Sequence, residues 1–174
     1  MTLKSLIAAT ACLLLVGCVS TGEESVGTTN TEVAGNWTIT IATDPETGDR
    51  LLFANVFSEP GFDDEIVWLG LLCDAAELEV GFGLEPPFEP AEPLIITTQI
   101  EDGPVIDRQG DVFDDGEPVV GFASNDVTVP FLDELAGGFA LTATVDNAGD
   151  VRGPALFDIT GVDMVAQRIR RDCL

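Results

Sequence analysis

The chain has 174 residues and a formal net charge of −24, with 31 acidic residues against 7 basic residues. Its length suits one domain with a sizeable core. The charge argues against nucleic acid as a partner, because binding it needs clustered cations, and against electrostatic adhesion to anionic lipid. Three explanations of the acidity stay open: adaptation to a salty environment, a surface that attracts a basic partner, and calcium binding.

The missing residue types narrow the possible chemistry. Histidine is absent, so Ser-His-Asp triads, Cys-His pairs and histidine zinc sites are ruled out. Two carboxylates could build a glycosidase, but nothing in the sequence singles out a pair. We therefore expect a protein that is not an enzyme and that needs no cofactor, with calcium as an open alternative.

The first residues predict an export signal. Lys4 precedes an apolar run, Leu6 to Val16, which is shorter than the ~20 residues that span a bilayer. The end of this run and the next two residues read Leu-Val-Gly-Cys, ending at Cys18, which resembles the lipobox of bacterial lipoproteins. The resemblance implies cleavage before Cys18 and its diacylation. The alternative is an ordinary secretory signal with an incidental cysteine.

The lipobox divides the chain into three expected parts. Residues 1–17 are the signal peptide, residues 18–34 are the lipidated cysteine with a flexible tether, and residues 35–174 form a single β-rich domain. The residue after Cys18 is Val19 and not an aspartate, and in this the chain resembles lipoproteins that are sorted to the outer membrane. We expect a lipid-anchored protein that faces the periplasm and meets a protein partner of the cell envelope.

Period-two alternation of apolar and polar residues dominates the predicted domain. A turn rich in acidic residues, at 44–49, joins the first two strands into a hairpin. Residues 65–73 are almost continuously apolar, which predicts a central strand covered on both faces with Trp68 in the core. Residues 102–118 are predicted to be turn-like. Strands are expected over 37–41, 50–58, 65–73, 77–84, 94–101, 119–124, 126–129, 139–145 and 155–159.

Two helices are predicted near the end of the chain. The first covers 130–136, with Pro130 in its first turn. The second begins after a capping Thr160 and has an apolar face that ends at Cys173. Its carboxyl end carries three arginines, which either oppose the helix dipole or form an anion site; they are Arg168, Arg170 and Arg171.

Cys73 and Cys173 are expected to form a disulfide, because two cysteines in an exported domain most often pair. The apolar helix face turns Cys173 toward the sheet, as a bridge to Cys73 requires. The alternative is two buried free thiols. The predicted fold class is all-β, a β-sandwich or partly open barrel with a C-terminal helix docked by a disulfide.

The sequence offers two candidate sites. The first is an acidic segment within 107–117, whose closely spaced carboxylates suit calcium but do not have the spacing of an EF-hand loop; a solvated acidic loop is the alternative. Phe88, within a proline-rich segment, is the preferred partner-contact residue. The candidate calcium ligands are Asp111, Asp114, Asp115 and Glu117.

The predicted elements follow a definite order. Trp37 opens the first strand, the turn at 44–49 follows, and an apolar strand ends at Cys73; the segments 99–102 and 157–161 come later, and a last helix ends at Cys173. This order resembles a family of small periplasmic accessory proteins associated with type VI secretion. Gln99 stands where that family tends to have arginine. The resemblance implies a secretion accessory or envelope-interaction role without a catalytic centre.

Three functions remain open from the sequence. The first is a non-enzymatic envelope lipoprotein that acts through protein–protein contact. The second is an acidic lipoprotein that inhibits a basic cell-wall lytic enzyme, and the third is a calcium- or glycan-binding module.

Overall fold

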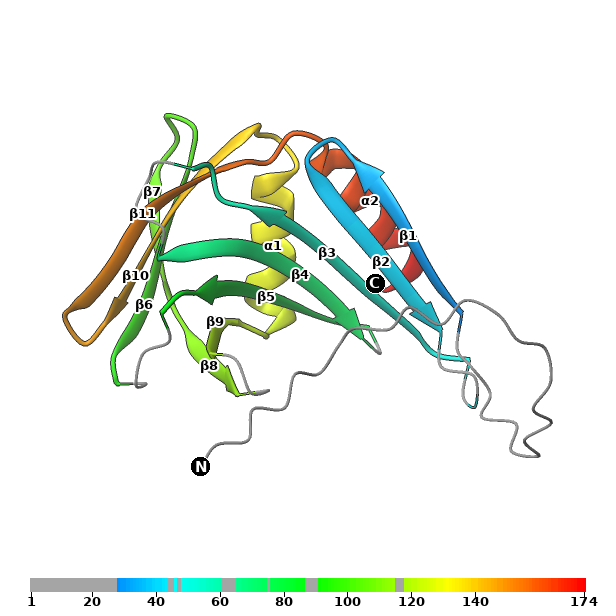
Figure 1. Ribbon diagram of the computed structural model, residues 1–174, viewed down its shortest axis with the longest axis horizontal. Helices are drawn as coiled ribbons and strands as arrows, with labels where there is room; N and C mark the ends of the chain where they lie inside the picture. The colour runs from blue at the N-terminus through cyan, green and yellow to red at the C-terminus, as the bar shows by residue number, and fades with distance from the viewer. Residues whose placement is uncertain are drawn as a thin grey trace, which may run out of the picture.

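The computed structural model describes residues 28–43, 46, 48–60, 65–74, 76–86, 91–114 and 118–174, and these form two antiparallel sheets and two helices (Figure 1). The predicted all-β class with a C-terminal helix docked by a disulfide is confirmed. The predicted leader, Cys18, Phe88, Asp115 and Glu117 lie outside the described residues. Within them, neither helix is long and apolar enough to cross a membrane.

The larger sheet has seven strands, most of them formed where the sequence alternates. Its order across the sheet is β1-β2-β3-β4-β5-β9-β8, and every neighbouring pair is antiparallel. The strands are β1 Thr29–Ala34, β2 Trp37–Thr43, β3 Arg50–Phe57, β4 Ile66–Asp74, β5 Glu77–Leu84, β8 Asp111–Asp114 and β9 Pro118–Phe122.

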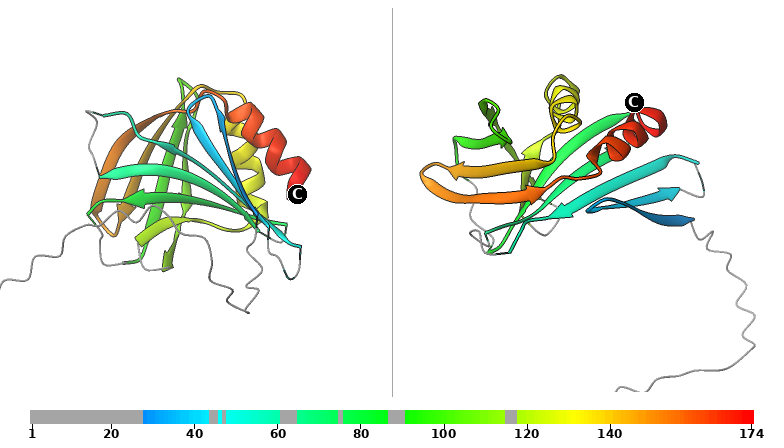
Figure 2. Two further views of the ribbon diagram at one scale, coloured as in Figure 1. Left: turned by 45° about the vertical axis from the view of Figure 1, so that its right-hand side comes forward. Right: turned by 90° about the horizontal axis from the view of Figure 1, so that it is seen from above.

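The smaller sheet has four strands in the order β11-β10-β6-β7, and β11 contacts β3 and β4 of the larger sheet. Helix α1, Asn125–Leu135, packs on β5, while α2, Val162–Asp172, packs on β1, β2 and β3 and touches α1. Figure 2 shows both helices on one side of the larger sheet. The smaller sheet consists of β6 Leu94–Ile100, β7 Val105–Gln109, β10 Ala140–Asn147 and β11 Asp150–Asp158.

The core fills the space between the larger sheet and the elements on its inner side. Alternate residues of each strand point inward, as period-two patterning predicts. In β2 these residues are Trp37, Ile39 and Ile41, and in β5 they include Val80 and Phe82. The other face of the larger sheet, which we call the outer face, has no helix on it among the described elements.

Strand β4 shows why the prediction of a strand covered on both faces was wrong. Leu69, Leu71 and Cys73 are fully buried on its inner side. Trp68 and Leu72 point the other way and are only half-buried. The apolar run therefore contains two different surfaces, one in the core and one at the outer face, and Trp68 does not belong to the core.

The disulfide between Cys73 and Cys173 joins β4 to the end of α2. The two Cα atoms lie 6.1 Å apart and the residues are 100 positions apart in sequence. A loop of ~100 residues is the kind for which closure constrains the unfolded chain most, by up to ~4.7 kcal/mol in the chain-entropy account. The bridge thus holds the last helix on the sheet.

The segment predicted to be turn-like, 102–118, instead contributes strands β7 and β8. Both are edge strands of their sheets. Val105, Asp107 and Gln109 of β7 are exposed, which a strand at a sheet edge tolerates. Asp107 and Asp111, two of the acidic residues in this segment, are therefore solvent-facing strand residues.

The predicted strand at 126–129 is helical, because α1 begins at Asn125. The Asn125 side-chain oxygen accepts a hydrogen bond from the Leu78 backbone N–H at 3.0 Å, and its amide donates to the Ala76 carbonyl at 3.0 Å. Pro130 lies inside the helix, not in its first turn as predicted. Proline has no N–H, so Pro130 donates no hydrogen bond to the carbonyl of Asp126, four residues earlier. Asp126 is exposed.

The ordered domain starts earlier than expected. Residues 29–34, predicted as part of the tether, form β1 and pair with β2. Gly35, in the β1–β2 turn, approaches the loop before α2 so closely that a Cβ on it would lie 2.0 Å from the Thr160 carbonyl oxygen. The Asn36 N–H donates to that same oxygen at 3.0 Å.

Thr160 does not cap α2 as predicted. The residue at the cap is Gly161, with a φ of 98° and no side-chain cap hydrogen bond. The Thr160 N–H instead donates to the Asp158 carboxylate at 3.0 Å. The loop before α2 can take this shape because residue 35, which lies against the Thr160 carbonyl, is a glycine and has no Cβ.

Candidate binding groove on the outer sheet face

The predicted calcium site receives no support from the described residues. Asp111 is exposed on β8, and Asp114 ends that strand. No group of three or more potential metal ligands occurs in the part of the chain that the structure describes.

Every arginine is paired with a carboxylate inside the fold. Arg108, the most buried, bonds Glu134 at 2.5 Å and the Thr98 hydroxyl at 2.6 Å, and its guanidinium lies 4.9 Å from the Phe131 ring centroid. Arg152 reaches both Glu65 and Asp150.

The arginines at the end of α2 tie the helix to its neighbours. Arg168 lies 3.5 Å from Glu32 of β1 and 2.6 Å from Asp172. Arg170 pairs with Asp133 of α1, and Arg171 with Asp172. These pairs favour the structural interpretation of the cluster over an anion site, because each guanidinium already has a counter-charge.

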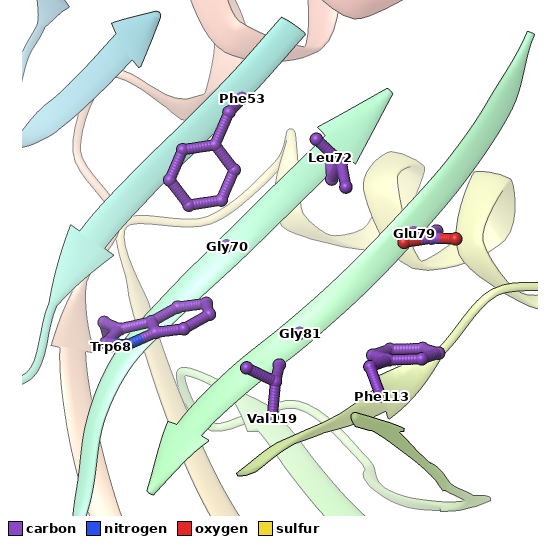
Figure 3. Close-up of a pocket in the computed structure, with 8 residues that line it drawn as sticks. All are labelled: Phe53, Trp68, Gly70, Leu72, Glu79, Gly81, Phe113 and Val119. Carbon is purple, nitrogen blue, oxygen red and sulfur yellow. The ribbon is translucent and has the colours of Figure 1, made fainter. Parts of the chain in front are cut away.

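The outer face carries an apolar groove across β3, β4, β5, β8 and β9 (Figure 3). We call it the outer groove. Its floor is the backbone at Gly70 and Gly81, and its cavity volume is about 120 Å³. Figure 3 shows five apolar side chains around this floor and the carboxylate of Glu79 at one side. The five are Phe53, Trp68, Leu72, Phe113 and Val119.

Strand register places these residues together. Leu72 lies directly opposite Phe53 on one side and Glu79 on the other. Gly70 pairs with Gly81, and Gly81 pairs in turn with Gly121 of β9. Three neighbouring strands thus present glycine in one row across the sheet. The row leaves a trough because the flanking positions carry large side chains.

The glycines also make room for the aromatic rings. A Cβ on Gly83 would lie 2.0 Å from the Trp68 indole nitrogen, so the indole rests directly on the strand backbone there. A Cβ on Gly70 would lie 2.7 Å from the same indole and 2.9 Å from the Phe53 ring. Phe53 and Trp68 meet edge to face, with ring centroids 6.2 Å apart. The two rings form a fixed wall.

The described charged side chains on the outer face are all acidic. The charged residues that the described strands turn toward it are Asp74, Glu77, Glu79 and Asp111. Asp74 lies directly opposite Glu77 across the β4–β5 pair, an arrangement in which like charges destabilise a sheet. Among the described residues no arginine points to this face, since each binds a carboxylate elsewhere.

Sequence reasoning missed the outer groove, although a signal was present. Gly70 is flanked by Leu69 and Leu71, and the uninterrupted apolar run was interpreted as burial on both faces. Gly81 and Gly83, two apart in β5, mark the second half of one face of that strand as free of side chains. The register that aligns Gly70 with Gly81 cannot be predicted from the sequence of either strand alone.

No protein family model and no curated protein matches the chain. Among solved structures it is similar to the crystal structure of invasion associated protein B from Bartonella henselae, with a TM-score of 0.56 and 15% sequence identity. The match covers 82% of this chain and 96% of that chain. At this identity the likeness concerns the fold alone.

Proposed function

We propose that this protein is a non-enzymatic lipoprotein of the bacterial envelope that binds a protein partner through the outer groove. The observation that carries the proposal is the groove itself, an apolar depression on an exposed sheet face. Exposed apolar patches rimmed by polar residues are typical of interaction sites. Phe57, opposite Trp68 in the register, extends the apolar surface and is 66% exposed.

The composition of the groove favours binding over catalysis. Glu79 is the single titratable residue that lines it among the described residues. Acid–base catalysis by carboxylates needs two groups with different roles around the scissile bond. An apolar floor with one carboxylate at its side suits recognition of a partner side chain.

The envelope location rests on the sequence. The lipobox-like segment ending at Cys18 supports lipid anchoring, and Val19 supports sorting to the outer membrane. The disulfide suits an oxidising compartment. The order of elements supports the narrower proposal of an accessory to a secretion apparatus, with the groove as its contact surface.

A photo-crosslinking amino acid at Leu72 tests this function in living cells. We expect a discrete protein adduct from this position, because Leu72 lines the outer groove. The matched control is the same amino acid at Val151, which is 54% exposed on β11 of the other sheet. Equal adducts from both positions, or none from Leu72 in the native envelope, would contradict the proposal.

A further inference from the structure

The occupant of the outer groove can be specified by its chemistry. We infer that the groove takes an extended segment of a basic partner protein, with an apolar side chain on the glycine floor and a lysine or arginine two residues away against Glu79. This inference rests on the proposed protein-binding function. It adds which residues the partner must present and at what spacing.

The size of the outer groove determines which apolar side chain of the partner it can accept. The groove volume of about 120 Å³ is comparable to the ~150 Å³ cavity that accepts a benzene ring. One branched aliphatic or phenyl side chain fills such a space. The surrounding walls are apolar, so burial of that side chain is favourable by about 25 cal/mol per Å².

Charge complementarity indicates that the second recognised residue of the partner is basic. Glu79 is half-buried at the side of the groove and makes no ion pair among the described residues. The nearby Asp74 and Glu77 face each other across two strands, so a cation brought by the partner relieves a repulsion already present in the sheet. Along β5, Glu79 and Gly81 are two residues apart, which is about 6.6 Å.

That distance matches an extended peptide. Residues i and i+2 of a strand also lie about 6.6 Å apart and point to the same side. When an apolar residue of the bound peptide lies over Gly81, the peptide residue two positions away from it therefore lies beside Glu79. The recognised pattern is an apolar residue, any residue, then a basic residue, in either chain direction.

Two other occupants are disfavoured by charge. A second copy of this chain would bring its own net charge of −24 and the same acidic face against the groove. The chain's own segment between Cys18 and β1 contains Glu23 and Glu24 and no cation. Neither provides the positive charge that the outer face lacks.

The inference can be measured with capped heptapeptides and the native tryptophans. The probe has leucine and arginine at alternate positions with serine between them, and the controls replace arginine by glutamate or leucine by serine. Trp37 is fully buried while Trp68 lines the groove, so protection from acrylamide quenching reports on Trp68. We expect only the leucine–arginine peptide to protect Trp68, with an affinity that falls as salt rises.

Charge-reversed variants of one strand give the matched control. Glu79→Lys should weaken binding of the leucine–arginine peptide about tenfold, and Glu77→Lys, which points to the same face outside the groove, less than about threefold. Glu79→Gln should lie between them and replaces the lysine variant if circular dichroism shows that variant to be misfolded. Leu72→Ser should weaken binding about tenfold, while Leu51→Ser, on the same face of β3, should not.

Each contrary result would overturn a defined part of the proposal. Equal protection by the glutamate peptide, equal effects of Glu79→Lys and Glu77→Lys, or no protection at millimolar peptide would remove the cationic occupant. A protein adduct at Leu72 in cells together with any of these results would leave the protein-binding function standing. Absence of that adduct would instead remove the function on which the inference rests.

Discussion

At the scale of single residues, Gly161 shows how a missing Cβ decides local structure. Gly161 and Gly149 have the same φ of 98°, but a Cβ would lie 2.2 Å from the Ala34 carbonyl oxygen at Gly161 and meet nothing within 4 Å at Gly149. We expect Gly149→Ala to lower the free energy of unfolding by about 1 kcal/mol, for backbone strain, and Gly161→Ala by about 3 kcal/mol. Urea denaturation measures both. Equal losses would show that the contact between the two turns does not restrict residue size.

At the scale of elements, α2 depends on the ionised form of Asp172. The hydrogen bond from Arg171, together with the charges of Arg168, Arg171 and Arg50, lowers the pKa of Asp172 below its ordinary value. Its contribution to stability is therefore present above about pH 4 and is lost as the pH falls through the lowered pKa. Asp172→Asn should cost about 1 kcal/mol at pH 7 and less at about pH 2, where more of the carboxylate is protonated. Denaturation at the two pH values tests this, with Asp102→Asn, in an exposed turn, as the control. A loss that is independent of pH would mean that packing, not charge, holds the helix end.

The elements also show what the sequence could predict. Strands with strict alternation, such as β2 and β5, were predicted from local pattern alone. The disulfide partner of Cys73 was predicted because two cysteines in an exported domain most often pair. Helix α1 was partly missed, because residues 127–129 near its start are all β-branched, while the start itself is fixed by hydrogen bonds of Asn125 with β5 and with the residue before that strand. Its buried residues follow helical spacing, which was the available signal; they are Thr128, Phe131, Leu132 and Leu135. The outer groove needed the register between strands, which no single segment encodes.

At the scale of the whole molecule, the arginines neutralise carboxylates within the fold and leave the excess negative charge on the surface. Such a surface offers no electrostatic attraction to an anionic membrane, so the proposed membrane attachment would depend on Cys18. Cys18→Ala should move the protein from the membrane fraction to the soluble fraction, as immunoblotting after cell fractionation would show. The matched control is Cys12→Ala, which lies inside the predicted signal and should leave membrane association unchanged. Membrane association of Cys18→Ala equal to that of the wild type would contradict lipid anchoring.

If Cys18 carries a lipid, as proposed, the early start of β1 would determine how far the domain can stand from the bilayer. Because β1 begins at Thr29, only the short stretch of chain between Cys18 and Thr29 would separate β1 from the anchor. At about 3.5 Å per residue, a fully stretched chain of that length spans roughly 40 Å. A lipid anchored at Cys18 would thus confine the outer groove to a thin layer above the membrane surface, and a partner must bring its basic segment into that layer to be bound.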